Sequence, residues 1–441
     1  MKYNILLLFL CLITLPCFAQ YVVEGGNGTP LLAKDDNSVK VYLLNGLSGA
    51  KISYTYDSST YIEHEWYKYK NSYSDKSSVK SRQSGNTSTI TDVEDGYGYF
   101  VELENTTDVS NHSVWIIDYS RKVPILNSLH IVEDEDQCEF INVLVDVDKD
   151  KLKLPYNAPN GDPLQIVRNY KLNYYTMVWN DVSKMFINSL KEENISDDVF
   201  EYQDPIEIAP PPLRNTTFTL SGDQFAKHFN IEEQIESKEY EAIAVKAEVL
   251  IDTLFTSSDN EMTGTTENFS APAGFTFTAY ANEPVATFYI WKVYNLDKSV
   301  TNPVSQTATK ILNYTFEDAG HYRVDLEVSN YQSTCTEKIT YDNIIISDFM
   351  LWVPNAFSPT TSPGINDVFK VAYKSIITFK GWIFNRWGNE LFHWTDPSQG
   401  WDGKYRGKYV PPGTYFYVIE ATGADGKRHV KKGDVNIVGG K

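Results

Sequence analysis

The chain has 441 residues and a net charge of −19 at pH 7, and 14% of its residues are aromatic. This length suggests about three to five domains. The acidic excess argues against a nucleic-acid partner, which would require clustered Lys and Arg. After residue 19 no stretch is long and apolar enough to cross a bilayer, so we expect no transmembrane segment.

Residues 1–19 have the pattern of a secretory signal peptide. Lys2 supplies a positive charge, an apolar run follows it, and small residues precede a cleavage point after Ala19. The apolar run is shorter than the roughly 20 residues of a membrane span. A lipid anchor at Cys17 is the alternative, although Pro16 is a poor match directly before an acylated cysteine. We therefore expect residues 1–19 to direct the chain out of the cytoplasm.

The remaining composition predicts an all-β fold. Tyr occurs 30 times and Phe 22 times, whereas Met occurs 5 times. Aromatic and β-branched residues favour the pleated, half-buried surface of a sheet. Short apolar runs recur between Gly, Asn, Asp and Pro, which is typical of β-sandwiches that follow one another along a chain.

Residues 20–125 are expected to form an immunoglobulin-like β-sandwich. Trp66 lies in the alternating run 63–69, which would place its ring in the core. The Asp95–Gly96 turn and the tyrosines after it resemble the tyrosine corner of such sandwiches, in which a phenol oxygen ties a turn to a strand. Residues 113–117 would be a late strand of the same sandwich.

Residues 126–250 are the least regular part of the sequence, and they are expected to form a β-sandwich of uncertain type. Short β runs occur at residues 140–147 and 174–178. Residues 221–225 are suited to open one helical turn, and residues 241–251 alternate well enough for a closing strand.

Residues 251–349 are expected to form a further β-sandwich. Trp291 lies in an aromatic run, and an acidic turn at 317–320 then precedes the alternating run 322–330. This order resembles the PKD family of immunoglobulin-like modules, which are common in extracellular proteins. The chain departs from the family's Trp-Asp-Phe-Gly-Asp core, because Lys292 follows Trp291. The resemblance implies a PKD-like β-sandwich.

Cys138 and Cys335 are the cysteines that remain after removal of the signal peptide. Export permits a disulfide between them, and two buried thiols are the alternative. Two cysteines without histidines at metal-ligand spacing do not make a zinc site.

Residues 350–441 carry a dense series of aromatic and glycine motifs. The opening segment 353–359 is followed by Asn-Asp-Val-Phe, Asn-Arg-Trp-Gly, Trp-Asp-Gly and Pro-Gly-Thr-Tyr, in that order. This series closely resembles the gliding motility-associated C-terminal domain, the type B sorting domain of the type IX secretion system in Bacteroidetes. The residues that carry the resemblance, taken here as the sorting-domain motif, are Pro354, Asn355, Phe357, Pro359, Asn366, Asp367, Phe369, Asn385, Arg386, Trp387, Gly388, Trp401, Asp402, Gly403, Pro412, Gly413 and Tyr415.

The resemblance implies a route and a partner. The signal peptide would take the chain into the periplasm. The type IX machinery would then recognise the folded C-terminal β-sandwich and move the protein across the outer membrane. For a type B domain, the recognition partner would be an outer-membrane protein of the PorP/SprF kind. The protein would end up extracellular or at the outer-membrane surface.

Charge sets this C-terminal region apart from the rest of the chain. From Leu351 onward, 12 Lys and Arg stand against 7 Asp and Glu, a net charge of +5, so the preceding residues carry −24. The basic residues are suited to form a docking face, and a merely solvated surface is the alternative. They are Lys404, Arg406, Lys408, Lys427, Arg428, Lys431 and Lys432.

No catalytic, cofactor or metal site is expected. The sequence has no P-loop, no dinucleotide-binding glycine pattern and no nucleophile elbow. The acidic run that starts at Asp146 imitates the start of a calcium loop. An EF-hand, however, needs Gly at its sixth position and Glu at its twelfth, where this chain has Lys151 and Asn157. We therefore expect the protein not to be an enzyme.

The fold expected for the whole chain is tandem immunoglobulin-like or PKD-like β-sandwiches with a C-terminal β-sandwich sorting domain. Loops at the ends of sandwiches commonly bind ligands, so the leading expectation for the body is a binding or adhesion module for glycan or protein. One alternative is a structural component of a surface or motility apparatus, which self-assembly would favour. The other is a hydrolase in residues 126–250, which a convergent pair of carboxylates in a cleft would favour.

Overall fold

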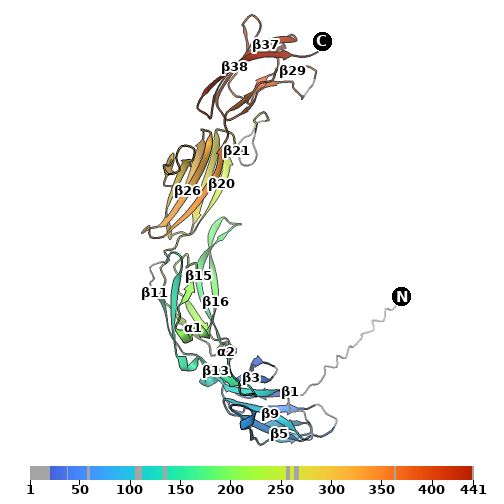
Figure 1. The fold of residues 1–441 in the computed structure, drawn as a ribbon, viewed down its shortest axis with the longest axis vertical. Helices are drawn as coiled ribbons and strands as arrows, with labels where there is room; N and C mark the ends of the chain where they lie inside the picture. Colours follow the sequence, from blue (N-terminus) through green and yellow to red (C-terminus); the bar gives the residue numbers. More distant parts are fainter. Residues whose placement is uncertain are drawn as a thin grey trace, which may run out of the picture. The chain divides into compact units, whose positions relative to one another are not determined.

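The computed structural model describes residues 20–36, 38–56, 60–104, 112–132, 137–254, 259–262, 268–361 and 364–439 (Figure 1). The expected signal peptide, residues 1–19, lies outside them. The chain is built of β-sheets, with short helices α1 (Asp197–Tyr202) and α2 (Gln224–His228), so the all-β prediction is confirmed. No helix in these residues is long and apolar enough to span a membrane.

Internal contacts divide the chain into two compact units. Unit 1 consists of Met1–Thr176 and Leu190–Glu241. Unit 2 consists of Met177–Ser189 and Ala242–Lys441. Each unit has its own sheets and its own apolar cores.

The first sandwich of unit 1 pairs a four-stranded sheet with a six-stranded sheet. Trp66 is buried in the core between them, as its alternating run predicts, and its indole Nε1 donates to Ser88 Oγ at 2.7 Å. Tyr99 forms the tyrosine corner, and its phenol oxygen accepts from the Glu94 amide at 2.7 Å. In sheet order, the strands are β1 (Gln20–Glu24), β4 (Lys51–Thr55), β8 (Thr87–Ile90) and β7 (Arg82–Ser84), then β2 (Leu31–Asp35), β3 (Val39–Leu44), β10 (Ser113–Asp118), β9 (Tyr97–Leu103), β5 (His64–Tyr69) and β6 (Ser77–Ser78).

The six-stranded sheet is buried on both faces. All six residues of its strand β10 are buried, which is typical of a strand without a solvent side. One face packs on the four-stranded sheet. The other face, with Phe100 and Trp115, packs on α2 and on the hairpin of β13 (Leu154–Asn157) and β14 (Pro163–Ile166). A single apolar core therefore joins residues on either side of position 125.

A buried ion pair lies at this junction. Arg168 Nε donates to Asp223 Oδ2 at 2.6 Å, and neither side chain has any exposed surface. The Tyr119 hydroxyl donates to the other carboxylate oxygen, and burial raises the pKa of Tyr119 far above its usual value. The Arg168 Nη groups donate to three backbone oxygens of nearby loops. The pair thus has the additional hydrogen bonds that two buried charges require.

The rest of unit 1 supplies a three-stranded sheet and most of a four-stranded sheet, whose β15–β16 tip at residues 177–189 belongs to unit 2. The predicted helical turn at residues 221–225 is confirmed as the start of α2. Asp223 is its N-cap and accepts from the amides of Phe225 and Ala226. In sheet order, the strands are β11 (Leu126–Val132), β12 (Ile141–Val147) and β17 (Ile206–Ile208), then β16 (Met185–Ser196), β15 (Asn169–Asn180), β18 (Thr219–Gly222) and β19 (Glu233–Glu236).

Unit 2 contains a third sandwich, built from a three-stranded and a five-stranded sheet. Trp291 is fully buried in it, and its indole Nε1 donates to the Thr309 backbone oxygen at 3.0 Å. The Tyr322 hydroxyl donates to the Asp318 backbone oxygen at 3.0 Å, across the acidic turn. In sheet order, the strands are β20 (Ala247–Leu254), β22 (Ala273–Ala281) and β25 (Ile311–Phe316), then β21 (Asn268–Phe269), β27 (Thr336–Ile346), β26 (Gly320–Asn330), β23 (Ala286–Asn295) and β24 (Ser305–Thr307).

The C-terminal domain of unit 2 has an apolar core of its own. Every residue of this core cluster lies between Phe349 and Ile437. Its main sheet has five strands, and three two-stranded sheets complete it. These strands are β29 (Ala356–Phe357), β38 (Arg428–Ile437), β37 (Gly413–Gly423), β32 (Ile376–Phe384) and β33 (Glu390–Trp394), with the pairs β28 (Met350–Trp352) and β31 (Ala372–Lys374), β30 (Phe369–Lys370) and β34 (Gly400–Trp401), and β35 (Lys404–Tyr405) and β36 (Lys408–Tyr409) (Figure 1).

The two cysteines lie in different units. Both Cys138 and Cys335 are disulfide-bonded, and Cys335 is buried. Neither cysteine is therefore a free thiol in this structure. Pairing of Cys138 with Cys335 stays a prediction.

Candidate functional site

Part of the C-terminal motif builds the core of its domain. Phe357, Phe369 and Trp401 are buried, with at most 3% of their surface exposed. The Phe357 ring centroid lies 5.9 Å from that of Phe369 and 5.5 Å from that of Trp401. Trp401 also meets Tyr415 edge to face at 5.4 Å. These four aromatic residues are scaffold, which agrees with the expectation that large rings fill a small core.

The Asn-Arg-Trp-Gly motif has a different role, because it forms the turn between β32 and β33. Asn385 Oδ1 accepts from the amides of Trp387 and Asn389, both at 3.0 Å, and Gly388 takes a positive φ of 81°. This turn directs the side chains of Arg386 and Trp387 outward. Trp387 is 71% exposed, and the Arg386 guanidinium lies 4.2 Å from its ring centroid.

The Pro-Gly-Thr-Tyr motif lies beside this turn. The register of β32 with β37 pairs Phe384 with Phe416, which brings the two motifs to the same end of the sheet. Tyr415 is held by a hydrogen bond from its hydroxyl to the Pro411 oxygen at 2.7 Å, and burial raises its pKa. Between the two motifs is an open pocket of about 350 Å³. It is lined by Asn385, Arg386, Trp387, Leu391, Val410, Pro411, Pro412, Gly413, Thr414 and Tyr415.

A basic hairpin, β35–β36, leads directly into this pocket, because Val410 follows it in the chain and lines the pocket wall. Lys404 Nζ lies 4.9 Å from the ring centroid of Tyr409, and the Arg406 guanidinium lies 5.1 Å from that of Tyr405. Stacked cations and rings on an open surface are typical of interaction sites. We call the pocket together with Arg386, Trp387 and this hairpin the Trp387 face.

The seven basic residues expected to form a docking face are not brought together. Lys404, Arg406 and Lys408 belong to the hairpin of the Trp387 face. The other four lie on β38 or in the turn before it, where Arg428 pairs with Thr422 at the far end of β37 from Thr414. At 3.3 Å per residue, Thr414 and Thr422 lie about 26 Å apart along β37. The hairpin group is the one that leads along the chain, through Val410, into the pocket that Trp387 lines.

The remaining motif residues fix loops. The Asn355 oxygen accepts from the Asn436 amide at 2.9 Å, and the oxygen of Asn366, which has a positive φ of 56°, accepts from the Ser358 amide at 2.7 Å. Asp367 Oδ2 accepts from the Gly364 amide at 3.1 Å. Asp402 forms an ion pair with Lys404 at 2.8 Å. Pro354 and Pro412 are half-buried and exposed, respectively, in the segments that lead into β29 and β37.

Gly403 provides a test of this packing. It has a positive φ of 78°, and a Cβ there would lie 3.0 Å from Pro359 Cγ. We expect Gly403→Ala to lower the free energy of unfolding of the C-terminal domain by about 2–3 kcal/mol, through left-handed backbone strain and overpacking. The matched control is Gly407→Ala, with a φ of 79° and nothing within 4 Å. Hydrogen exchange of peptides from residues 351–437 measures both, and equal losses would contradict the packing argument.

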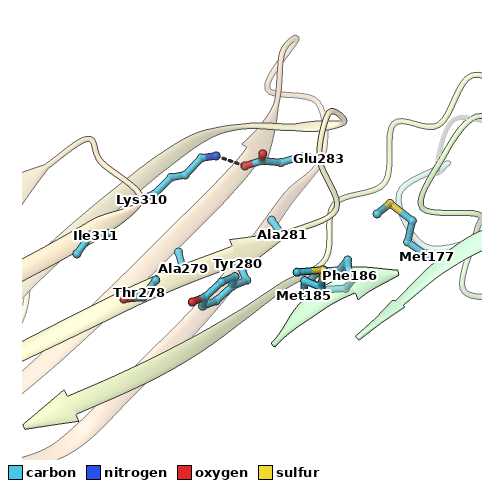
Figure 2. Close-up of a pocket in the computed structure, with 10 residues that line it drawn as sticks. All are labelled: Met177, Met185, Phe186, Thr278, Ala279, Tyr280, Ala281, Glu283, Lys310 and Ile311. Atoms are coloured by element: carbon cyan, nitrogen blue, oxygen red, sulfur yellow. Dashed lines mark ion pairs between the residues drawn. The ribbon is translucent and has the colours of Figure 1, made fainter. Parts of the chain in front are cut away.

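A second pocket, also of about 350 Å³, lies within unit 2 (Figure 2). Met177, Met185 and Phe186 from the tip of β15–β16 line one side, and residues of β22 line the other. Glu283 and Lys310 form an ion pair at this pocket. Burial opposes ionisation of Glu283, but hydrogen bonds with Lys310 and Tyr289 hold its pKa below the usual value. The two charges neutralise each other, so no net charge remains to attract an ionic ligand.

The acidic run that imitates a calcium loop has a local structural role. Asp148 caps a 3-10 turn at Lys149–Lys151 and accepts from the Asp150 amide at 3.0 Å. Over the residues that the structure describes, no group of three or more His, Cys, Asp or Glu side chains is placed to hold a metal ion. Leu391 and Val410 of the Trp387 face lie outside the motifs predicted from the sequence. They flank the motifs, but nothing in their type marks them.

Comparison with known proteins gives two family matches. Residues 351–437 match the CHU_C type IX secretion signal domain, and residues 130–237 match a fibronectin type III domain. The first confirms the C-terminal resemblance. The second indicates that the β-sandwich of uncertain type expected at residues 126–250 contains a fibronectin type III domain. The PKD resemblance of residues 251–349 stays a prediction.

No curated protein matches the chain. Among solved structures, it is similar to a tetra-tandem repeat in the extending region of a large adhesion protein. That match has 10% identity and a TM-score of 0.21, and covers 91% of this chain and 99% of the other. At this TM-score the two chains do not superpose as wholes, so the match carries no functional argument.

Proposed function

We propose that the type IX secretion machinery recognises the signal domain at residues 351–437 in its folded state, through the Trp387 face. The protein is thereby exported to the cell surface or beyond. The partner is an outer-membrane protein of the PorP/SprF kind that presents an acidic, apolar surface. The acidic body ahead of the domain is the cargo.

One observation carries the proposal. The Asn-Arg-Trp-Gly and Pro-Gly-Thr-Tyr motifs lie far apart in the sequence and line one open pocket, while the aromatic residues of the other motifs are buried. A buried motif residue is explained by packing alone. An aromatic side chain that is 71% exposed contributes little to stability, and exposed tryptophans beside arginines are the residues that commonly anchor protein interfaces.

We further propose that the body is a binding or adhesion module for glycan or protein. Tandem β-sandwiches delivered outside the cell present loops at their ends, where ligands are commonly held. Fibronectin type III domains share this architecture, so the match at residues 130–237 supports a binding role.

The buried carboxylates of unit 1 also favour binding over hydrolysis. A hydrolase needs two carboxylates that face a shared open cleft. Asp223 is fully buried and bonded to Arg168 and Tyr119, and it caps α2 as well. Burial raises the pKa of Asp197, which is also buried. We therefore propose that the protein is not an enzyme.

Removal of the C-terminal domain tests the export proposal. We expect the full chain to reach the surface of a type IX-competent host, and the chain without residues 351–441 to accumulate in the periplasm. Surface proteolysis of intact cells and fractionation measure the distribution. A host that lacks the type IX machinery is the control and should retain both proteins. Surface delivery of the truncated chain would refute the assignment.

A further inference from the structure

The C-terminal domain receives a side chain from outside its matched range. Asn260, in the segment that connects β20 and β21 of the third sandwich, donates through Nδ2 to the backbone oxygens of Val371 at 2.8 Å and Pro397 at 2.7 Å. Its backbone oxygen accepts from the Tyr373 amide at 3.2 Å, and the Met262 amide donates back to the Tyr373 oxygen at 2.7 Å. Residues 260–262 thereby extend the β28–β31 sheet through a parallel bridge between Glu261 and Tyr373.

A second contact holds the same two parts together. Ser375 is fully buried. Its amide donates to Ser270 Oγ at 2.8 Å, and its own Oγ accepts from the Ala271 amide at 3.2 Å. The Ala319 amide donates to the Ala424 oxygen at 2.9 Å. Three segments of the third sandwich therefore hold the C-terminal domain, in addition to the short connection between β27 and β28.

The bonds of Asn260 are linked to the Trp387 face through one edge-to-face aromatic contact. Val371 directly follows β30, and Pro397 lies in the loop before β34. These two strands pair Phe369 with Trp401, so Asn260 ties the two flanks of this short sheet to each other. Trp401 packs against Tyr415, which lines the pocket of the Trp387 face.

We propose that Asn260 is a positioning residue of the Trp387 face, so that the unit read during export begins in the third sandwich rather than at residue 351. The inference rests on the proposed function of that face. Its physical basis is that two carbonyl groups from separate loops share one amide donor. Without that amide, both carbonyl groups lose this donor, and the strand that carries Trp401 is free to shift under Tyr415.

The test compares three variants in the full chain. Asn260→Asp is nearly isosteric but cannot donate, and Asn260→Ala removes the group. Asn302→Ala, at an exposed position of the same sandwich, is the control. We expect export to the surface to fall roughly tenfold in both Asn260 variants, as for a misplaced site, and to stay unchanged in the control. In full chain labelled with fluorotryptophan, the ¹⁹F signals of Trp401 and Trp387 should shift, and those of Trp66 and Trp291 should not.

Each other result overturns the inference. Normal export of the Asn260 variants does so, as does reduced export without a shift of the Trp401 signal. Collapse of the Trp66 and Trp291 signals would show that Asn260 supports general folding instead of the Trp387 face. A failure of the proposed function gives a different result in a different experiment. If residues 351–441 were not the export signal, the chain without them would still reach the surface.

Discussion

Replacing Trp387 with Ala is expected to reduce export of the full chain roughly tenfold or more, the usual effect of losing an interface tryptophan. The loss should come from recognition and not from folding. Trp387 is 71% exposed and lies at a turn held by the side chain of Asn385, so the thermal midpoint should move by no more than about 2 °C. Quantitative surface labelling gives the export, and a thermal melt of protein purified from the periplasm gives the stability.

Trp352→Ala is the matched control for this prediction. Trp352 is 60% exposed and belongs to the same domain, but it does not line the pocket. Its removal should leave export close to normal. Export of the Arg386→Ala variant should lie between that of the other two variants, because this change removes the cation stacked on Trp387 and keeps the ring. Equal export of the Trp387 and Trp352 variants would leave the Trp387 face without a role in recognition.

Truncation of Arg168 to Ala should be the most destabilising single change in unit 1. It would leave the Asp223 carboxylate buried without its cation, and it would remove the donor to the oxygens of Lys122, Lys151 and Leu152. Breaking a buried ion pair from one side costs about 3–5 kcal/mol. Denaturant unfolding followed by hydrogen exchange should show this loss in peptides of unit 1.

Arg121→Ala serves as the control for that experiment. Arg121 also pairs with a carboxylate, that of Asp118, but its side chain is 71% exposed. Exposed ion pairs contribute about 0–1 kcal/mol, so this variant should unfold almost as the wild type does. A similar small loss for Arg168→Ala would mean that water reaches Asp223 and that the junction is not sealed.

The sequence predicts the local features of this fold well. Alternation around Trp66 and Trp291 identifies strands with a buried ring, and both rings are buried. The run before Gln224 identifies a helix start, because Asp is a good N-cap and the capping bonds are local. These predictions succeed because the alternation of apolar residues, the residue preferences of turns and helix capping all depend on neighbours a few residues away.

Long-range polar contacts could not be predicted in this way. Arg168 and Asp223 are 55 positions apart, and Asn260 and Val371 are 111 apart. The sequence gives residue types alone, and an arginine or asparagine that forms a long-range hydrogen bond has the same type as a solvated one. Nothing in the sequence therefore indicates the contacts of Arg168 and Asn260. The same holds for Trp387: the motif contains two tryptophans, Trp387 and Trp401, and the sequence does not show that only the ring of Trp387 faces solvent.

The core shared across position 125 has a consequence for how the protein matures. A chain that enters the periplasm from its N-terminus delivers Tyr119 104 positions before Asp223. Until Phe225 and Phe229 arrive, the face that carries Phe100 and Trp115 is covered only in part, by the β13–β14 hairpin. The first sandwich is thus a poor choice for separate expression, because a fragment that ends before α2 lacks part of the cover of Phe100 and Trp115. We expect a periplasmic chaperone to bind the chain during this interval, while part of this apolar face is still exposed.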